Sequence, residues 1–486
     1  MSVPRVSGRR PDFCQLQRRA SGRAVAMVRS CMTAVLFMML GGVSDRFASG
    51  QERAAAGEAS NESWPGTYDG PSVGGVDNAT LIGKVVCGYQ GWFTTPTDGS
   101  GRGWRHYSKN GRFEPGRCNI DLWPDVSELD ADELYPTSFR NADGSTAHVF
   151  SSHNRKTVVR HFEWMREHGI DGAMVQRFAV ETVPQLDVKH VNQVLASCRE
   201  GANRSGRVYA VMYDLSGLGA GGVQRVKEDW SRLVERMRIG RDSNDNAYLR
   251  HRGKPLVAVW GVGFNDGRKY TLDECAELID FLQNDPKNGG CAVMLGVPTG
   301  WRTLDADAVR DEKLLRIIER VEIVSPWAVG RFRDDAGIRR HVETRLKPDM
   351  AWCAERKVDY LPVVFPGFSW HNMRPQSTFD EIPRRGGQFL WNQYLAANQS
   401  GAKMVYQAMF DELDEATAIF KCSHEPPVGE SRFVTSPGLP TDHYLWLTGQ
   451  GGRLIRGEIQ PTAALPVRNP KPLAPTKAPA PTKKTW

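Results

Sequence analysis

Four carboxylates lie within five positions near the end of the chain: Asp411, Glu412, Asp414 and Glu415. They follow an apolar segment, residues 404–410, that is typical of a buried strand. Carboxylates at the end of such a strand are costly unless they are solvated or take part in a reaction. Hydrolysis of a glycosidic bond needs two carboxyl groups in different protonation states. Glu412 and Glu415 are three positions apart, so both face one site if the turn curls helically. A solvated acidic surface loop is the alternative.

The acidic stretch follows the last of eight apolar runs that suit buried parallel strands. These runs are residues 84–93, 171–178, 207–215, 255–264, 291–297, 321–327, 360–365 and 404–410. Amphipathic stretches that predict helices lie between most of them, at residues 155–168, 186–198, 223–237, 272–282, 306–320, 337–356 and 387–397. This alternation predicts an α/β fold with a single closed (β/α)8 barrel. An open doubly wound sheet would carry a phosphate-type glycine-rich turn after its first strand, and residues 88–92 are not one.

Catalytic residues of such barrels lie at the C-terminal ends of the strands. The residues that follow the predicted strands are rich in aromatic, charged and amide side chains. We expect the following residues to bind the substrate: Tyr89, Trp92, Gln176, Arg177, Tyr213, Asp214, Trp260, Trp327, Trp370, His371 and Asn372. Aromatic faces cover the C–H surfaces of sugar rings, while charged and amide groups bind hydroxyls. The composition of this end therefore favours a sugar site.

Several of these residues also have a purely structural interpretation. Tyr89 and Trp92 could pack the barrel rim, and Asp214 could cap a helix. Arg177 could pair with a structural acid, and Trp260 could belong to the core. The sequence leaves these alternatives open.

The barrel domain is predicted to span residues 81–467. Most of its length beyond a minimal barrel lies in a long loop after the first strand, residues 94–154, which should cover the catalytic end. Residues 51–80 are rich in Gly, Ala, Ser, Asn and Glu and predict a linker. Residues 468–486 are mainly Pro, Lys, Ala and Thr and predict a disordered tail.

Residues 1–50 predict a signal peptide and leader. An Arg-rich start is followed by an apolar run at residues 31–43 and by small residues at 48–50. The run is too short to span a membrane comfortably, and no cysteine follows it at the spacing of a lipid attachment site, so no stable membrane anchor is expected. The protein should be secreted or periplasmic, and its mature form should begin near Gly50.

The formal net charge of +7 arises at the two ends of the chain. Residues 1–50 hold eight Arg and two Asp (+6), and residues 468–486 hold five cations and no acid (+5), which leaves −4 between them. A mildly acidic domain gives no reason to expect a nucleic-acid partner. Of nine cysteines, seven lie beyond the leader without CxxC spacing, so neither a zinc site nor a cofactor is expected.

A series of motifs in strand order resembles the bacterial glycoside hydrolase family 99 and its family 71/99-like relatives. The motifs are GYQGWF at 88–93, HFEWM at 161–165, GIDG at 169–172, QRF at 176–178, MYDLSG at 212–217, SPW at 325–327, PGFSWHN at 366–372 and FDE at 410–412. The resemblance covers about residues 81–455. It implies a (β/α)8 barrel with endo-α-1,2-mannosidase or endo-α-1,2-mannanase activity, acting with retention and without a metal.

The same resemblance places the two essential glutamates of the family on Glu412 and Glu415. It implies that Glu412 deprotonates the 2-hydroxyl of the sugar, which attacks the anomeric carbon to form a 1,2-anhydro sugar. Glu415 protonates the leaving oxygen and then activates water. One position departs from the family pattern, because Ala416 stands where Gly is expected. A methyl group there restricts the turn if it needs a positive φ.

The expected function is that of a secreted retaining endo-glycosidase that hydrolyses an α-linked polysaccharide or oligosaccharide, with α-mannan as first choice. A polymer containing xylose or arabinose is an alternative substrate for the same two glutamates. A third possibility is a non-catalytic glycan-binding protein on a hydrolase scaffold. The presence of both glutamates disfavours it, because a binding protein does not need a buried carboxylate pair.

Overall fold

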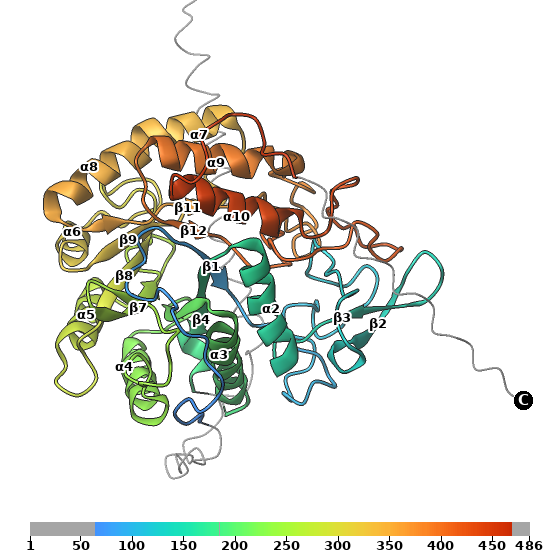
Figure 1. Ribbon diagram of the computed structural model, residues 1–486, viewed down its shortest axis with the longest axis horizontal. Helices are drawn as coiled ribbons and strands as arrows, with labels where there is room; N and C mark the ends of the chain where they lie inside the picture. Colours follow the sequence, from blue (N-terminus) through green and yellow to red (C-terminus); the bar gives the residue numbers. More distant parts are fainter. Residues whose placement is uncertain (1–63, 184, 469–486) are drawn as a thin grey trace, which may run out of the picture.

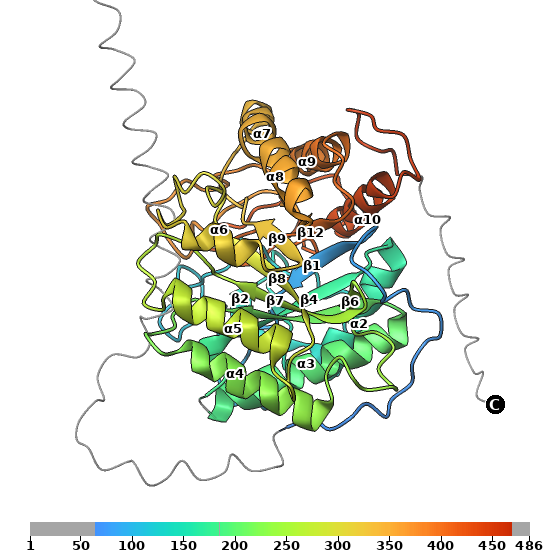
Figure 2. The same ribbon diagram turned by 90° about the vertical axis from the view of Figure 1, so that its left-hand side faces the viewer.

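The computed structural model describes residues 64–183 and 185–468 of the 486-residue chain. The expected signal peptide and leader, residues 1–50, lie outside the described residues, and so do 51–63 of the expected linker and 469–486 of the expected tail. In the described part, helices surround a central set of strands, as Figures 1 and 2 show from two directions.

The central sheet follows the eight predicted strand positions. Its parallel strands are β1 (Val85–Tyr89), β4 (Gly172–Phe178), β5 (Val208–Asp214), β7 (Lys254–Trp260), β8 (Ala292–Val297), β9 (Ile323–Pro326), β10 (Asp359–Tyr360), β11 (Val363–Val364) and β12 (Val405–Gln407). Their order in the sheet is β10-β9-β8-β7-β5-β4-β1-β12-β11. Nearly all of these residues are buried, as expected for parallel strands that are covered on both faces.

The barrel closes through residues 359–364, a strand position that is shared between two neighbours. Its first half, β10, pairs with β9, and its second half, β11, pairs with β12. Within this stretch the Leu361 N–H donates to the Val324 carbonyl, and the Pro362 carbonyl accepts from the Tyr406 N–H, both at 2.9 Å. Pro362 has no N–H to donate to β9. The two ends of the sheet are therefore one continuous segment, and the predicted (β/α)8 barrel is confirmed.

The helices are α2 (Arg155–His168), α3 (Gln185–Ser205), α4 (Val223–Arg232), α5 (Leu272–Asn284), α6 (Lys313–Ile318), α7 (Asp335–His341), α8 (Lys347–Arg356), α9 (Gln388–Gln399) and α10 (His443–Ile455). The bounds of α2 are those that the sequence predicts. The Asn154 side chain accepts from the Lys156 N–H at 3.0 Å, and Gly169 ends the helix at φ 73°.

The helix predicted over residues 306–320 is mostly absent, and only the six residues of α6 are helical there. Leu304 and Ala306 adopt positive φ angles of 52° and 49°, which are incompatible with a helix. The Asp307 carboxylate accepts from the N–H groups of Thr299 and Gly300, at 3.1 and 2.8 Å. The segment before α6 is therefore a loop that is held by a side chain.

The long loop after β1 contains an antiparallel hairpin, β2 (Tyr135–Arg140) and β3 (Thr146–Val149). This hairpin lies at the side of the barrel (Figure 1). Part of the loop reaches the acidic stretch, because the N–H groups of Asp121 and Leu122 donate to the Leu413 carbonyl at 2.9 and 3.2 Å. The loop is thus joined to the C-terminal end of the barrel, as the sequence predicts.

Residues 64–80, the described part of the expected linker, lie against the outside of the barrel. Tyr68 is buried, and its N–H donates to the Asp242 carboxylate at 2.6 Å. The Arg199 guanidinium of α3 lies 5.5 Å from the centre of the Tyr68 ring. The Val73 N–H donates to the Asn203 carbonyl at 2.9 Å. This segment therefore packs on α3 and on the loop that carries Asp242.

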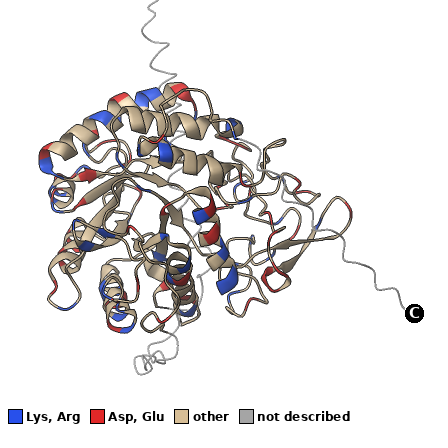
Figure 3. Ribbon diagram, in the orientation of Figure 1, with Lys and Arg blue, Asp and Glu red and all other residues tan. Residues whose placement is uncertain are grey.

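The charged residues are found mostly on the helices and loops around the strands (Figure 3). Among the described helices, none combines the length and the apolar character that a membrane-spanning helix requires.

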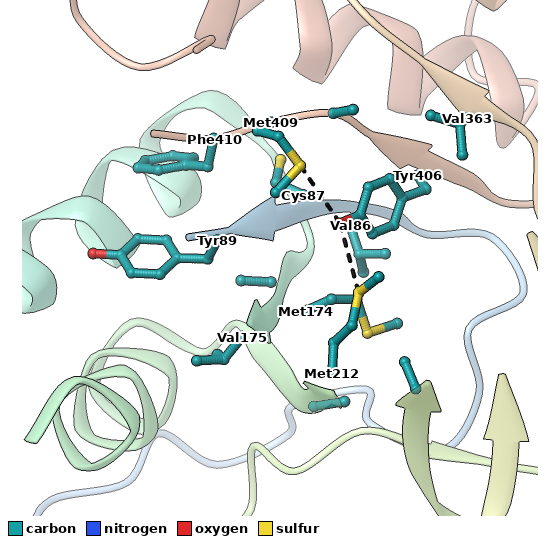
Figure 4. Close-up of a cluster of buried hydrophobic side chains, with 14 of the residues drawn as sticks. Val86, Cys87, Tyr89, Met174, Val175, Met212, Val363, Tyr406, Met409 and Phe410 are labelled. Atoms are coloured by element: carbon teal, nitrogen blue, oxygen red, sulfur yellow. Dashed lines mark hydrogen bonds between the residues drawn. The ribbon is translucent and has the colours of Figure 1, made fainter. Parts of the chain in front are cut away.

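A cluster of three side chains, Tyr406, Met212 and Met409, packs at the centre of the barrel. The Tyr406 hydroxyl lies 3.7 Å from the Met212 sulfur and 3.6 Å from the Met409 sulfur (Figure 4). Gly88 of β1 faces this cluster. A Cβ atom at Gly88 would lie 2.1 Å from the Tyr406 hydroxyl oxygen and 2.2 Å from the Met409 terminal carbon, so only glycine fits.

Gly88→Ala should therefore destabilise the barrel by about 1–3 kcal/mol, the usual cost of overpacking a core. Gly219→Ala is the matched control, because a Cβ atom there meets no heavy atom within 4 Å. Urea unfolding, monitored by circular dichroism, gives the free energy of unfolding of each variant. Equal stability of the two variants would contradict the packing described for β1.

Candidate active site

The acidic stretch begins where β12 and β1 end side by side. The Phe410 N–H donates to the Gly88 carbonyl at 2.7 Å. The Asp411 carboxylate accepts from the N–H groups of Gln90 and Gly91, at 2.7 and 2.8 Å. Asp411 is fully buried, and its side chain joins the two strand ends. It therefore positions the loop.

The chain then makes a tight turn that returns beneath Glu412. The Ala418 N–H donates to the Glu412 carbonyl at 2.9 Å. Ala416 adopts a φ of 51°, in the left-handed region, which costs an L-residue with a Cβ atom about 1–2 kcal/mol. The Arg384 guanidinium donates to the carbonyls of Ala416 and Ala418, at 2.8 and 2.6 Å. The position at which the resemblance predicts Gly does need a positive φ, and surrounding hydrogen bonds hold Ala416 there.

Glu412 and Glu415 lie at the same end of the barrel. Glu412 is 4% exposed, whereas Glu415 is partly exposed. The Gln90 amide donates to Glu412 Oε1 at 2.7 Å, and the Thr417 hydroxyl donates to Oε2. The two carboxyl groups are close enough for the charge on Glu412 to raise the pKa of Glu415. The predicted pair is therefore brought together.

Burial raises the pKa values throughout this acidic stretch. It raises the pKa of Asp411 to about 7, and it raises the pKa of Glu412 and of Asp414. The pKa of Glu415 is raised well above its ordinary value by burial first and then by the charges of Glu412 and Asp414. The Gln90 and Thr417 donors oppose this rise at Glu412. The two donors thus favour the ionised form of Glu412, whereas the charge of Glu412 favours the protonated form of Glu415.

Two partly exposed tryptophans provide aromatic faces at this end. The Trp260 and Trp327 ring centres are 5.6 Å apart at an angle of 80°, and Trp327 lies 6.2 Å from the Tyr406 ring. The pKa of Tyr406 is raised by burial first and then by Glu412, and Asp214 contributes as well. Both acids therefore face the same interior. Trp260, Trp327 and Asp214 thus lie at the same end of the barrel as the glutamate pair.

Asp214 ends β5, where the Ser216 N–H donates to its carboxylate at 2.7 Å. Burial raises its pKa, and the nearby Arg268 charge opposes the rise. The Arg268 guanidinium lies 5.1 Å from the Trp260 ring centre, and its Nε–H donates to Asp266 at 3.0 Å. A cation over an aromatic face and a buried carboxyl thus lie together at the ends of β5 and β7.

Trp92 and Trp370 have little ring face left for a ligand. The His106 ring is stacked on Trp92 with centres 3.8 Å apart, and the Phe178 ring lies 5.4 Å away. The Arg374 guanidinium lies 4.7 Å from the Trp370 ring centre. Both tryptophans are less than 10% exposed. They lie at the expected end of the barrel but cannot act as stacking platforms in this arrangement.

Several buried polar atoms at this end have no hydrogen-bond partner among the described residues. They are Gln90 Oε1, Trp92 Nε1, Gln176 Oε1, Trp260 Nε1 and Trp370 Nε1. The three indole N–H groups can only donate, and the two amide oxygens can only accept. Because buried polar groups are normally paired, this set is suited to a ligand with many hydroxyl groups, which both donate and accept.

Tyr89, Arg177 and Tyr213 point away from the barrel interior, toward the surrounding helices. The Tyr89 hydroxyl is 2.9 Å from His161 Nδ1 on α2, and Figure 4 shows its ring directed away from the Tyr406–methionine cluster. Arg177 donates to Asp229 of α4 at 2.6 and 2.7 Å, and the Tyr213 hydroxyl donates to the same carboxylate at 2.6 Å. Successive side chains of a strand face opposite sides, so these three residues pack between sheet and helices and do not line the site.

His371 and Asn372 lie in the loop after the seventh strand position. Both hydrogens of the Asn372 amide are used, in bonds to the carbonyls of Ile120 and Arg432 at 2.8 and 2.6 Å. Asn372 therefore secures the loop. His371 Nδ1–H donates to the Ser377 carbonyl at 2.9 Å, which leaves Nε2 of a neutral ring as an acceptor.

Several residues at this end of the barrel are outside the predicted catalytic and substrate-binding set. They are Gln90, His106, Asp121, Arg268 and Thr417. Asp121 accepts from the Ser369 hydroxyl and from the N–H groups of His371 and Asn372, the latter two at 2.7 and 2.8 Å. His106 Nδ1 lies 3.1 Å from the Asp414 carboxylate. Only the alternation of side chains along β1 could have indicated Gln90. The others come from loops whose positions the sequence does not reveal.

One group of described acids, Asp130, Asp132 and Glu133, has oxygens close enough to share a cation. Lys156 already lies 2.6 and 2.9 Å from the two aspartates, and Arg160 lies 2.5 Å from Glu133. These ion pairs account for the cluster.

No family model matches the chain, and no curated protein matches it in sequence. Solved structures are similar in fold. The GH99 endo-α-mannosidase from Bacteroides thetaiotaomicron has a TM-score of 0.57 at 16% identity, over 78% of this chain and 99% of that chain. A complex of the same enzyme with bis-tris-propane has a TM-score of 0.55 at 17% identity over the same shares. The chain thus has the (β/α)8 fold of a family 99 structure, as its sequence motifs predict.

Proposed function

We propose that this protein is a retaining glycoside hydrolase that cleaves internal bonds of an α-linked glycan, with α-mannan as the first substrate to test. The observation that carries the proposal is the Glu412–Glu415 pair at the C-terminal end of the barrel. Its members interact electrostatically, and two neutral donors hold the carboxyl group of Glu412. The similar Bacteroides protein is an endo-α-mannosidase, which supports mannose as the first choice.

In the first step, Glu412 accepts the proton of the sugar 2-hydroxyl. The O2 atom attacks C1 and forms a 1,2-anhydro sugar, while the C1–O bond to the leaving group breaks. Glu415 gives its proton to the leaving oxygen. The raised pKa of Glu415 suits an acid, and the two donors on Glu412 suit a base.

In the second step, the Glu415 carboxylate takes a proton from water, and the water oxygen attacks C1. The C1–O2 bond opens, and O2 regains its proton from Glu412. Two inversions at C1 give net retention, and both glutamates return to their starting protonation states. The partly exposed Trp260 and Trp327 provide faces for neighbouring sugar rings.

The test is incubation of purified full-length protein with α-mannan and with an activated 2-fluoro α-mannoside. Oligosaccharides should be released from the mannan. The 2-fluoro substrate has no 2-hydroxyl, so mass spectrometry should find no covalent adduct. An adduct on Glu412 would replace this route by direct displacement. Absence of cleavage on all α-linked glycans, with the protein folded, would overturn the proposed function.

A further inference from the structure

The two oxygens of the Glu412 carboxyl are held by donors from two different segments of the chain. Gln90, just beyond β1, donates its amide N–H to Oε1 at 2.7 Å, and Thr417, on the returning turn, donates its hydroxyl to Oε2. Thr417 is fully buried, and Gln90 is 8% exposed. The two bonds fix both the direction of the carboxyl group and the lone pairs left for substrate.

The backbone around both donors is itself fixed. The Gln90 and Gly91 N–H groups bind Asp411, and the Gly91 carbonyl accepts from His190 Nε2 at 2.8 Å. On the other side, Arg384 donates to the Ala416 carbonyl, which holds the peptide unit before Thr417, and to the Ala418 carbonyl one residue further along. The Thr417 carbonyl itself accepts from the Met409 N–H at 3.2 Å. The left-handed turn at residue 416 brings Thr417 back to Glu412. Together these contacts form a rigid frame around the carboxyl group of Glu412.

We propose that Gln90 and Thr417 are positioning residues that keep Glu412 as the proton acceptor of the glutamate pair and so separate its role from that of Glu415. The inference rests on the proposed function. A neighbouring pair of carboxyl groups shares a proton unless their surroundings differ. Donors aimed at one member favour its ionised form. Glu412 has two such donors, and both belong to neutral side chains that cannot supply a competing charge.

Other charged and titratable groups also face the pair. Asp411 and Asp414 raise the pKa of Glu412, Tyr406 lies within reach of its charge, and Arg374 acts on Glu415 in the opposite sense. His106 contacts Asp414, and Asp214 faces the same interior from β5. None of these groups is removed by a substitution at Thr417 or Gln90. Thr417→Val isolates one donor, whereas Gln90→Met also removes the free Oε1 acceptor, so for Gln90 the position of the pH inflection, and not KM, reports on the donor.

The decisive variant is Thr417→Val, which keeps the shape of the side chain and removes the hydroxyl. Glu412 must be ionised to act, so activity is lost as the pH falls through its pKa. Loss of a donor raises that pKa. The acid-side inflection of kcat/KM on an α-mannooligosaccharide should move up by about one pH unit, a roughly tenfold loss below the inflection. Thr417→Ser should restore the wild-type profile, and Gln90→Met should shift it as Thr417→Val does.

Thr157→Val is the matched control. Thr157 is buried on α2 and donates its hydroxyl to Glu133 at 3.0 Å, so it loses the same kind of bond away from the site. It should leave the pH profile unchanged. If Thr417→Val and Gln90→Met lower kcat/KM equally at all pH values, with no shifted inflection, the proposal is wrong.

Carboxyl titration of 13C-glutamate-labelled protein by NMR gives a readout that does not need turnover. The Glu412 resonance, identified by its loss in Glu412→Gln, should titrate at higher pH in Thr417→Val than in the wild type. This measurement separates the two hypotheses. If the wild type cleaves no α-linked glycan but Glu412 titrates at higher pH in Thr417→Val, the proposed function is refuted and the role of the two donors stands. If the wild type cleaves the glycan but Glu412 titrates at the same pH in both proteins, the proposed function stands and the role of the donors is refuted.

Discussion

Glu412→Gln is expected to lower kcat by roughly 10²–10⁴-fold on every substrate, whatever its leaving group, because loss of a positioned base cannot be offset by a better leaving group. The effect of Glu415→Gln should instead depend on the leaving group. On an α-linked oligosaccharide, whose departing oxygen needs a proton, it should lower kcat as much as Glu412→Gln does. On an aryl glycoside with an acidic phenol, which leaves without a proton, it should lower kcat much less. The ratio of the two losses measures the division between base and acid.

The experiment is a comparison of kcat for both variants on an α-mannooligosaccharide and on an activated aryl α-mannoside. Glu425→Gln, an exposed change of the same type, serves as the control and should keep the wild-type rates. Equal losses for Glu415→Gln on both substrates would remove its role as acid. If Glu412→Gln retains near-wild-type activity, the carboxyl pair is not the catalytic centre.

Asp229→Ala is expected to be among the most destabilising single changes in the protein. Asp229 and Arg177 are each 2% exposed and are joined by two hydrogen bonds, and the Tyr213 hydroxyl donates to the same carboxylate. Removal of one partner leaves a buried charge unpaired, which costs about 3–5 kcal/mol. The free energy of unfolding in urea measures this loss. Glu343→Ala, which breaks an exposed ion pair with Lys347, should stay close to the wild type.

A double variant at the same ion pair tests where Arg177 acts. A double variant, Arg177→Met with Asp229→Leu, removes both charges and should regain much of the stability that Asp229→Ala loses. The KM of folded Arg177→Met with Asp229→Leu should match the wild type, because Arg177 faces the helices. A large rise in KM without loss of stability would return Arg177 to the substrate site.

The sequence was sufficient to predict the eight strand positions and the end of the barrel that holds the acids, because apolar runs and their spacing depend only on local composition. It was not sufficient to say which face each strand-end residue takes. Gln176 and Asp214 point inward, whereas their neighbours Arg177 and Tyr213 point outward. The choice depends on a register that local sequence does not reveal, since a shift of one residue reverses every side chain.

The C-terminal helix α10 also escaped prediction. Its glycines at 449, 451 and 452 are typical of a turn. In the structure a Cβ atom at Gly449 would lie 1.8 Å from the His168 carbonyl at the end of α2. Close contact between the helices thus requires a residue that disfavours helix formation locally. Tertiary packing decides the outcome at this position.

The contacts that the long loop makes with the site could not be predicted for a similar reason. His106 and Asp121 belong to a stretch without periodicity, and their partners, Asp414 and the backbone of residues 371 and 372, are hundreds of positions away. Pairing of this kind is set by the closed barrel and leaves no pattern in the neighbouring sequence.

The pairing of β1 with β12 has a consequence for the order of events during synthesis. Val85 is aligned with Val405, and the Gln90–Glu412 hydrogen bond spans 322 positions. A growing chain presents Gln90 long before Glu412 has been translated. The surroundings of Glu412 are therefore incomplete until β1 and β12 pair and close the barrel. This contact between distant parts of the sequence is slow to form, because closing a long loop costs chain entropy. Incomplete or partly folded chains should therefore be inactive, and the appearance of activity during synthesis or refolding should coincide with closure of the barrel.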